Sequence, residues 1–198
     1  MIPYFGTEFD DVEWKIESEP VPYEAALDFM EKRVEAISQG TQKELILIVE
    51  HLPIYTLGTS AREEDILDAG VPFIKTSRGG QVTYHGPGQK IIYVMMKMSR
   101  FDNDLKKYLR VLKESVAKPL REMGVDIINN DSHIGLWANH PEKGPSKIAF
   151  IGIRIRKGIS FHGISVNMNP DLNAFSKIVP CGVKGEKITS LVDLKIEK

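Results

Sequence analysis

The sequence predicts one α+β domain over residues 1–198, and three observations support this class. Two segments, Tyr23 to Ile37 and Leu105 to Met123, repeat apolar side chains every three or four residues, as amphipathic helices do. Short apolar or alternating runs lie before, between and after these segments and predict strands. The chain contains no repeat, low-complexity tract or linker, and 198 residues suffice for one sizeable core. Many strands combined with only two long helices indicate the α+β class.

The first half of the chain predicts strands on either side of the first helix. Val12 to Glu17 alternates apolar and charged residues and predicts a strand. The helix that begins at Tyr23 is expected to end before Gly40, which takes the position of a C′ glycine. Glu44 to Val49 is a short continuous apolar run, which predicts a buried strand. Glu63 to Leu67 predicts one or two helical turns.

The second helix follows a central strand. Ile91 to Met98 is mostly apolar and predicts that strand. Asp102 or Asn103 is expected to cap the helix, because a side-chain oxygen at that position accepts a bond from a free backbone N–H. Pro119 lies inside the helical pattern, so a kink or break is expected near Lys118.

The last third of the chain predicts mainly sheet. Ile134 to Ala138 is a short strand, and Asn139 to Ser146 is expected to form a turn that exposes His140. Lys147 to Arg156 and Gly158 to Asn169 predict two strands of an antiparallel hairpin with a tight connection.

The composition excludes several classes of function. The net charge of −1 gives no electrostatic support for binding nucleic acid or an anionic membrane. No apolar run approaches the roughly 20 residues of a membrane span, and the N-terminal residues do not form a signal peptide. A single cysteine excludes an intramolecular disulfide and favours a reducing compartment. A cytoplasmic location, or a mitochondrial matrix after processing, is therefore expected.

The most unusual stretch is RGGQVTYHGPGQ, from Arg78 to Gln89. It holds four glycines, which permit positive φ or a close approach of a ligand to the backbone. One interpretation is a hairpin with glycine turns, and the other is a binding site. Arg78 can pair with an anion and His85 can exchange protons near neutral pH, which favours a site. The Gly-Lys-Ser/Thr ending of a P-loop is missing.

Cys181 is the candidate nucleophile. A lone cysteine is usually a small buried hydrophobe, but a Pro-Cys-Gly turn suits an accessible thiol better than a core position. Lys147 is a candidate cationic neighbour, although a solvated lysine is the simpler interpretation. His85 and His162 compete as bases, and Gly163 beside His162 permits close approach of a ligand. The five histidines form no short-spaced pair, so no metal site is expected.

Together these segments resemble the lipoyl(octanoyl) transferases, the octanoyl-acyl-carrier-protein:protein N-octanoyltransferases of the lipoate-protein ligase B type. The resemblance extends from about Glu50 to Leu191 and keeps the order of the family's motifs. The segments that carry it are RGGQVTYHGPGQ at 78–89, KIAFIG at 147–152, FHG at 161–163, PCG at 180–182 and TSL at 189–191. Pro119 is a departure, because the corresponding helix is usually continuous in the family.

The resemblance implies a fold and a reaction. The fold is that of the biotin and lipoate ligases, a central mixed sheet flanked by helices with a smaller second sheet. The reaction moves an octanoyl group from octanoyl-acyl carrier protein to a lysine of a lipoyl domain, through a thioester on the enzyme. The acceptors it implies are lipoyl domains of 2-oxoacid dehydrogenase complexes and glycine-cleavage-type proteins, with no nucleic acid or membrane partner. Cys181 is the nucleophile, and Lys147 lowers the pKa of its thiol and then serves as acid and base.

The resemblance also implies the residues that bind the acyl group. These are Arg78, Gly79, Gly80, Gln81, Val82, Thr83, Tyr84, His85, Phe150, Ile151, Gly152, Gly163, Ile164 and Ser165. His162 is a candidate base or orienting group, and the candidate donors to the reaction's oxyanion are backbone N–H groups near Gly152 or in the Gly79-Gly80 loop. No cofactor is expected, because transfer from a thioester to an amide runs downhill without ATP.

Two other functions remain open at this level. An ATP-dependent lipoate or biotin ligase on the same fold activates its acid as an adenylate and does not need Cys181. A non-catalytic module that docks acyl carrier or lipoyl domains needs neither Cys181 nor Lys147.

Overall fold

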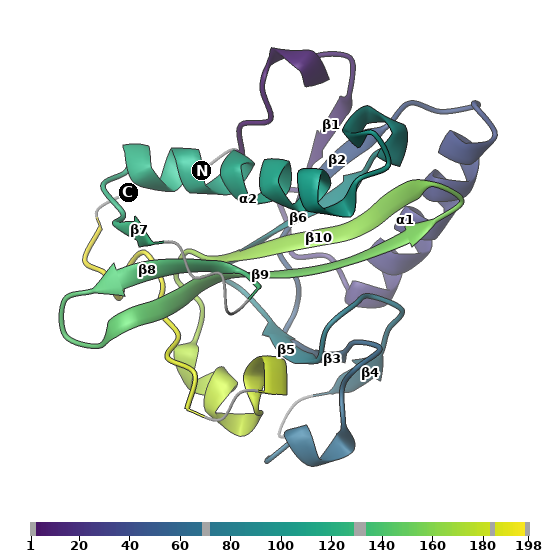
Figure 1. The fold of residues 1–198 in the computed structure, drawn as a ribbon. Coiled ribbons are helices and arrows are strands. Elements are labelled where there is room, and N and C mark those ends of the chain that lie inside the picture. The colour runs from purple at the N-terminus through teal and green to yellow at the C-terminus, as the bar shows by residue number, and fades with distance from the viewer. Residues whose placement is uncertain (1–2, 69–71, 129–133, 183–184, 197–198) are drawn as a thin grey trace.

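The strands of the computed structural model form two sheets (Figure 1). It describes residues 3–68, 72–128, 134–182 and 185–196, without the side chains of Glu8, Glu63 and Cys181. In this part of the chain, the larger sheet has the order β1-β2-β6-β10-β9-β8-β7 and the smaller sheet has the order β4-β3-β5. The strands of the larger sheet are β1 (Glu13–Ile16), β2 (Leu45–Val49), β6 (Gln89–Met95), β7 (Ile127–Ile128), β8 (Leu136–His140), β9 (Gly144–Arg156) and β10 (Ile159–Asn167). Those of the smaller sheet are β3 (Ile54–Leu57), β4 (Phe73–Lys75) and β5 (Val82–His85).

Two α-helices and several 3₁₀ turns accompany the sheets. The α-helices are α1 (Tyr23–Ser38) and α2 (Leu105–Glu122). The 3₁₀ turns are η1 (Thr7–Phe9), η2 (Glu63–Asp65), η3 (Met98–Phe101), η4 (Leu172–Lys177) and η5 (Pro180–Gly182). Both sheets are mixed, because β1 pairs with β2 and β3 with β4 in parallel while the other strand pairs are antiparallel. The predicted α+β class, with a mixed central sheet and a smaller second sheet, is confirmed.

The two helices cover opposite faces of the larger sheet. In β2, Leu45, Leu47 and Val49 pack with side chains of α1, whereas Ile46 and Ile48 pack with side chains of α2. Successive side chains of a strand point to opposite faces, so a continuous apolar run lies in two cores at once. This explains why β2 has no polar residue.

The cap predicted for α2 is wrong by one or two residues. Asp104 is the N-cap, and its carboxylate accepts bonds from the backbone N–H groups of Lys106 (2.7 Å) and Lys107 (3.3 Å). Asp102 and Asn103 instead have positive φ values of 56° and 57°. They form the turn that leaves η3, which the apolar pattern did not reveal.

Pro119 does not break α2, which continues to Glu122. A proline cannot donate to the carbonyl four residues earlier, here that of Ser115. That carbonyl accepts the backbone N–H of Tyr4 instead, at 2.7 Å. The N-terminal segment thus replaces the missing helical bond, and the Lys118 ammonium lies 3.7 Å from the centroid of the Tyr4 ring.

The β8–β9 connection is shorter than predicted. Strand β8 continues to His140 and β9 begins at Gly144, so Lys147 lies within the strand and does not open it. His140 is 4% exposed, which contradicts the expected exposed position. Its Nδ1 accepts the backbone N–H groups of Glu142 and Lys143, both at 3.1 Å, so this histidine organises the turn from inside.

The antiparallel hairpin of β9 and β10 is confirmed, and it is the longest feature of the sheet (Figure 1). Lys157 and Gly158 connect the strands with positive φ at both positions, as two-residue hairpin turns of type I′ require. The C-terminal segment runs beside β9, where the Lys147 N–H donates to Lys187 (2.7 Å) and the Lys147 carbonyl accepts from Thr189 (3.0 Å). None of the described helices is both long and apolar enough to cross a membrane.

Candidate active site

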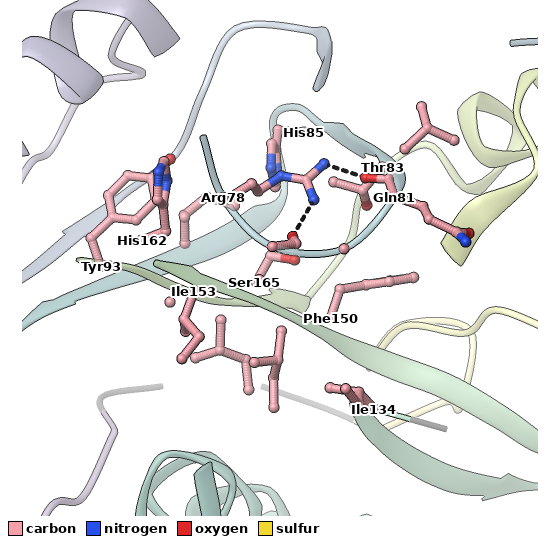
Figure 2. Close-up of a pocket in the computed structure, with 18 of the residues that line it drawn as sticks. Arg78, Gln81, Thr83, His85, Tyr93, Ile134, Phe150, Ile153, His162 and Ser165 are labelled. Atoms are coloured by element: carbon pink, nitrogen blue, oxygen red, sulfur yellow. Dashed lines mark hydrogen bonds between the residues drawn. The ribbon is translucent and has the colours of Figure 1, made fainter. Parts of the chain in front are cut away.

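A pocket of about 440 Å³ lies where the glycine-rich loop and β5 meet the β9–β10 hairpin (Figure 2). Most of the residues expected to bind the acyl group line it. The expected residues that line it are Arg78, Gly79, Gly80, Gln81, Val82, Thr83, His85, Lys147, Phe150, Ile151, Gly152, His162, Gly163, Ile164 and Ser165. Segments that are far apart in the sequence therefore meet in one site.

Among the expected site residues whose side chains are described, Tyr84 does not line the pocket. The Tyr84 ring packs against Tyr55 and Phe175, in the core beneath the smaller sheet. The side chain of Cys181 lies outside the described part of the structure, but its backbone forms the η5 turn. Gly182 in that turn has a φ of 67°, and a Cβ there would lie 1.8 Å from the Gln81 Oε1 atom. The turn that carries Cys181 therefore packs directly against a pocket-lining side chain.

Sequence reasoning missed eight lining residues, and none of them belongs to the motifs that indicated the site. They are Tyr23, Ser60, Ile91, Tyr93, Leu105, Leu109, Ile134 and Ile153. Leu105 and Leu109 belong to the apolar face predicted for α2. A helix stripe gives no signal that part of it faces a cavity.

Lys147 reaches the pocket because of a β-bulge. The pairing register of β8 with β9 shifts by one residue beyond Leu136, which leaves Ile148 as the extra residue. Ile148 and Ala149 both pack into the core on the α2 side. Lys147 consequently turns to the same side as Phe150, with its Nζ 5.2 Å from the centroid of that ring. In a regular strand, residues three apart would point to opposite faces.

The Lys147 ammonium is buried with a carboxylate. Its Nζ lies 3.0 Å from Glu186 Oε1, and both side chains are 1% exposed. The Trp137 ring is 5.3 Å away, so two aromatic faces contribute cation–π attraction. Gly135 leaves room for the aliphatic stem, since a Cβ there would lie 2.6 Å from the Lys147 Cε. Glu186 was not predicted from the sequence, because no motif residue indicates it.

Arg78 organises the glycine-rich loop. Its guanidinium donates to the backbone carbonyls of Thr56 (2.5 Å), Gly79 (3.0 Å) and Gln81 (2.7 Å), and to the Thr56 hydroxyl (2.9 Å). The residue expected to pair with an anion therefore ties the glycine-rich loop to β3. Its buried charge also faces the histidines of the pocket.

The glycines of the loop allow it to dock on β9. The Gly79 N–H donates to the Ile153 carbonyl at 2.8 Å, and a Cβ at Gly152 would lie 3.1 Å from the Gly79 carbonyl oxygen. Gly80 has a φ of 84°, which L-residues rarely adopt. The expected positive φ is thus confirmed at Gly80, whereas the close approach of a ligand to the loop backbone stays a prediction. Because the Gly79 N–H is already bonded, it is not a donor for a reaction oxyanion.

His162 departs from the alternation of β10. Its φ is 59°, and its ring stacks on the neighbouring Phe161 ring at 4.8 Å and lies 6.3 Å from Tyr93. Figure 2 shows the two rings of His162 and Tyr93 together at one end of the pocket. Within the described residues neither ring nitrogen of His162 has a hydrogen-bond partner, although the residue is only 1% exposed. Such a buried pair of unused polar atoms fits a site that is completed by a ligand.

Burial keeps the pocket histidines neutral. It lowers the pKa of His85 to about 3, with help from the neighbouring His51, and lowers the pKa of His162 to about 3, with help from the Arg78 charge. The pKa of His51 is also lowered by burial. Near neutral pH these imidazoles are hydrogen-bonding groups and weak bases. Among the described residues, no three His, Cys, Asp or Glu side chains gather in a way that could hold a metal ion.

The fold and the pocket define a class of protein. The model of the lipoyl protein ligase A/B catalytic domain matches residues 22–197, which is most of the chain. Solved structures agree on the fold. A T. acidophilum protein with bound lipoic acid has a TM-score of 0.71 at 20% identity over 92% of this chain and 77% of its own. A lipoate-protein ligase A bound with ATP has a TM-score of 0.62 at 17% identity over 93% and 81%.

Within this class, the chain belongs to the octanoyltransferase family and is an acyltransferase. The octanoyltransferase of Ehrlichia ruminantium is 48% identical over 93% of this chain and 89% of its own length. That of Nitrobacter winogradskyi is 44% identical over 93% and 82%, and that of Parvibaculum lavamentivorans is 46% identical over 95% and 85%. The family that the motifs resemble is therefore confirmed.

Proposed function

We propose that this enzyme moves an octanoyl group from octanoyl-acyl carrier protein to a lysine of a lipoyl domain, through a thioester on Cys181. This is the first step of endogenous protein lipoylation, and residues 1–198 act as one catalytic domain. The names of the related octanoyltransferases support the acyl group. The acceptors are lipoyl domains of 2-oxoacid dehydrogenase complexes and glycine-cleavage-type proteins. The cytoplasmic location remains a prediction.

The position of Lys147 carries the proposal. A bulge in β9 turns its amine into a largely apolar pocket, where the ammonium lies between aromatic rings and beside Glu186. A lysine there has no structural advantage over an apolar residue of the same size, since burying a charge is costly. The turn that carries Cys181 packs against Gln81, which lines the same pocket. A cation near a cysteine stabilises the thiolate, which is the nucleophilic form.

The reaction then has two balanced halves. In the first, the Cys181 thiolate attacks the donor thioester, a new C–S bond forms, the bond to the carrier's sulfur breaks, and the leaving thiolate takes a proton from the Lys147 ammonium. In the second, the acceptor amine attacks the enzyme thioester, a C–N bond forms, and the Cys181 thiolate is released. The amine must lose a proton during this step, and the Lys147 amine, which gave up its proton in the first half, accepts it.

The pKa values of the histidines support Lys147 as the base. An imidazole whose conjugate acid has a pKa of about 3 holds a proton poorly, so His85 and His162 are inefficient acceptors of a proton from an amine. In the proposed function both act as neutral hydrogen-bonding groups, and His162 orients the substrate.

The pocket walls fit an eight-carbon chain. Phe150, Ile151 and Ile164 belong to the predicted lining, and Leu105 and Leu109 add an apolar wall from α2. Burial of each methylene contributes roughly 0.8 kcal/mol, so the six methylenes of an octanoyl chain contribute several kcal/mol. This free energy is sufficient to select chain length loosely.

The nearest alternative is an ATP-dependent ligase, because a solved structure with the same fold holds ATP. A ligase needs free octanoate and ATP and forms no acyl-enzyme. The P-loop motif is missing from the sequence, and an assay of ATP dependence separates the two functions.

Intact mass measurement tests the proposal directly. After mixing with octanoyl-acyl carrier protein, the enzyme should gain one octanoyl group, which peptide mapping should place on Cys181. The Cys181→Ala variant should gain none and should not modify a lipoyl domain. Modification of the lipoyl domain by Cys181→Ala at a normal rate, or only with ATP and free octanoate, would exclude the thioester route.

A further inference from the structure

A chain of buried side-chain hydrogen bonds connects the pocket to the C-terminal segment. His85 Nδ1 lies 2.7 Å from Gln89 Oε1, and Gln89 Nε2 donates to Asn167 Oδ1 at 2.9 Å. Asn167 Nδ2 in turn donates to the backbone carbonyl of Thr189 at 2.9 Å. Gln89, Asn167 and Thr189 are completely buried, so water does not compete for these bonds. The Thr189 N–H donates to the Lys147 carbonyl at 3.0 Å, so these hydrogen bonds connect His85 with the backbone of Lys147 in β9.

The last carbonyl fixes the direction of every bond in this chain. A backbone carbonyl only accepts, so the Asn167 atom that faces it must be the amide nitrogen. The Asn167 oxygen then faces Gln89 and must accept, which assigns the amide nitrogen of Gln89 to that side. The Gln89 oxygen is left for His85, and it too only accepts. His85 must therefore carry its proton on Nδ1, and in the neutral ring Nε2 keeps a lone pair.

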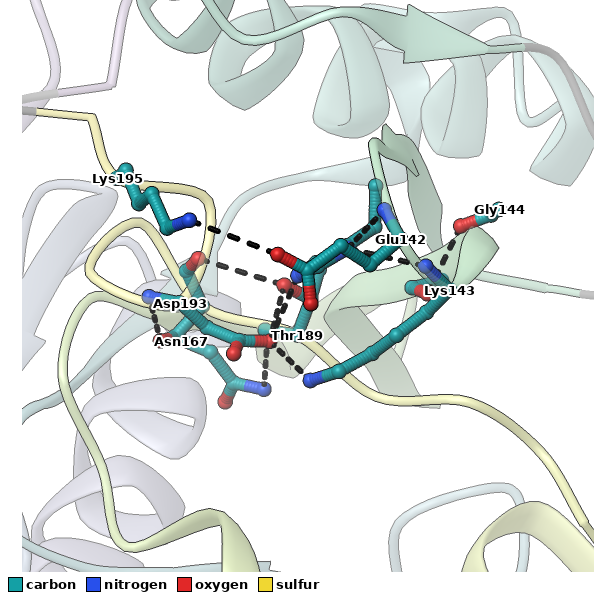
Figure 3. Close-up of polar contacts among 10 residues, drawn as sticks. Glu142, Lys143, Gly144, Asn167, Thr189, Asp193 and Lys195 are labelled. Atoms are coloured by element: carbon teal, nitrogen blue, oxygen red, sulfur yellow. Dashed lines mark hydrogen bonds and ion pairs between the residues drawn. The ribbon is translucent and has the colours of Figure 1, made fainter.

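The Thr189 carbonyl is itself held in place (Figure 3). The Thr189 hydroxyl donates to Asp193 Oδ2 at 2.9 Å, and the Lys143 ammonium donates to the same oxygen at 2.6 Å. The Asp193 N–H donates to the Ser190 hydroxyl at 3.1 Å. Burial alone would raise the pKa of Asp193, but the bonds from Lys143 and Thr189 outweigh burial and lower it. The Asp193 carboxylate therefore stays ionised at neutral pH and keeps its bond to the Thr189 hydroxyl.

We propose that Gln89 and Asn167 are positioning residues that hold His85 in its Nδ1–H tautomer, so that Nε2 accepts a hydrogen bond from an N–H group of the substrate. His85 lines the pocket, and its Nδ1 is the only ring nitrogen that the described hydrogen bonds engage. The contact with substrate rests on the proposed function, whereas the tautomer does not. Two substrates bring an N–H group: an amide in the arm of the acyl carrier, or the amine of the acceptor lysine.

The surroundings of the ring keep this acceptor available. The ring lies parallel to Tyr23 at 6.0 Å and edge-on to His51 at 5.9 Å, and the Arg78 and His162 side chains also face it. These neighbours and burial disfavour the imidazolium, which would have no lone pair. His85 thus differs from a general base, because it accepts a hydrogen bond without taking the proton.

Imidazole ¹⁵N NMR of the ligand-free enzyme tests the tautomer. The His85 signals are identified by their loss in His85→Asn, and at pH 7 they should report a protonated Nδ1 and an unprotonated Nε2. Gln89→Leu removes the acceptor and should abolish this fixed pattern, whereas Gln89→Glu keeps an oxygen for Nδ1–H and should retain it. His51 is the internal control, because its Nδ1 lies 2.6 Å from the Val21 carbonyl and does not depend on Gln89.

Single-turnover kinetics of folded Gln89→Leu identify the N–H group. Loss of one hydrogen bond with correct geometry should slow a half-reaction about tenfold. Slower acylation of Cys181 assigns the contact to the carrier's arm, and slower transfer to the lipoyl domain assigns it to the acceptor amine. The proposal is overturned if wild-type His85 carries its proton on Nε2, if Gln89→Leu leaves the tautomer unchanged, or if neither half-reaction slows. An enzyme with the expected tautomer but no octanoyl transfer would refute the proposed function and the substrate contact, and would leave the positioning roles of Gln89 and Asn167 intact.

Discussion

Strands β2 and β6 follow the alternation of an ideal sheet, whereas β9 and β10 break it in two places. In β6, Ile91 and Tyr93 face α1 while Ile92 and Val94 face α2. In β9, a bulge after Lys147 places two successive residues on the α2 side. In β10, the left-handed backbone of His162 places its ring beside that of Phe161.

The two departures have the same consequence. Each turns one polar residue, Lys147 or His162, towards the pocket, while regular alternation would have buried it in the core against α2. A left-handed L-residue costs about 1–2 kcal/mol and a bulge gives up ladder bonds, so neither feature improves the fold by itself. The regular strands contribute stability, whereas the irregular features of β9 and β10 lower stability while they orient chemical groups. The two regions should therefore respond differently to mutation.

The largest effect is expected at the bulge. Lys147→Arg keeps the positive charge beside Glu186 but does not readily give up its proton, since arginine stays protonated in proteins. Some acylation of Cys181 should remain, while transfer to the lipoyl domain should fall by about 10²–10⁴-fold. Single-turnover assays of each half-reaction measure the difference. Lys157→Arg, in the exposed turn of the same hairpin, is the control and should react normally. Undiminished transfer by Lys147→Arg would show that Lys147 is not the base that accepts the proton of the acceptor amine.

The regular strands should show the opposite response. Ile46→Ala removes a completely buried side chain of β2 that does not line the pocket, and it should lower the free energy of unfolding by about 2–5 kcal/mol. The rate per folded molecule should not change. Urea unfolding and an active-site titration measure the two quantities. Ile16→Ala in β1, where the side chain is 56% exposed, is the matched control with little expected loss. A lower rate per folded Ile46→Ala molecule would mean that the two regions are not separable.

The irregular region should also make stability depend on pH. His162 has a pKa of about 3 when folded, against about 6.5 in an unfolded chain, so below pH 6.5 only the unfolded state binds the proton. The contribution of His162 to stability is fully present above pH 6.5 and is lost progressively as the pH falls towards 3. Between pH 7 and pH 5, His162 should contribute a loss of about 2 kcal/mol in the free energy of unfolding, and His85 a similar amount. In His162→Gln the loss in the free energy of unfolding between pH 7 and pH 5 should be smaller than in the wild type by about 2 kcal/mol, which is the contribution of His162. Equal losses in the variant and the wild type would show that His162 is not buried in its neutral form.

The smallest effect on stability is expected in the loop. Gly80→Val forces a β-branched residue into a φ of 84°, which costs about 1–2 kcal/mol of unfolding free energy. Because the loop docks on β9 and forms one wall of the pocket, binding of the acyl substrate should weaken more than folding does. Gly144→Val, at a φ of 70° in the distant β8–β9 turn, is the matched control for strain without contact to the pocket. Normal KM and kcat in folded Gly80→Val would contradict a binding role of the loop and favour its interpretation as a hairpin with glycine turns.

Local patterns in the sequence determined much of the fold. The three- and four-residue spacing of α1 and α2, the apolar run of β2 and the paired runs of β9 and β10 each predict the observed element. These signals are local because helix and strand periodicity depends only on which side of an element is buried. The motifs likewise predicted which segments would meet, from the glycine-rich loop to the Cys181 turn.

The direction in which the side chains of the site point follows from tertiary contacts and not from local sequence patterns. Sequence periodicity places Lys147 on the α2 face, and only its pairing with β8 reveals the bulge that reverses it. The continuity of α2 through Pro119 depends on a bond from Tyr4, more than 100 residues earlier in the chain. The partners of Gln89, Asn167 and Glu186 likewise come from distant segments. The reason is physical: a side chain's direction depends on strand register and on long-range hydrogen bonds, and neither leaves a periodic trace in the sequence.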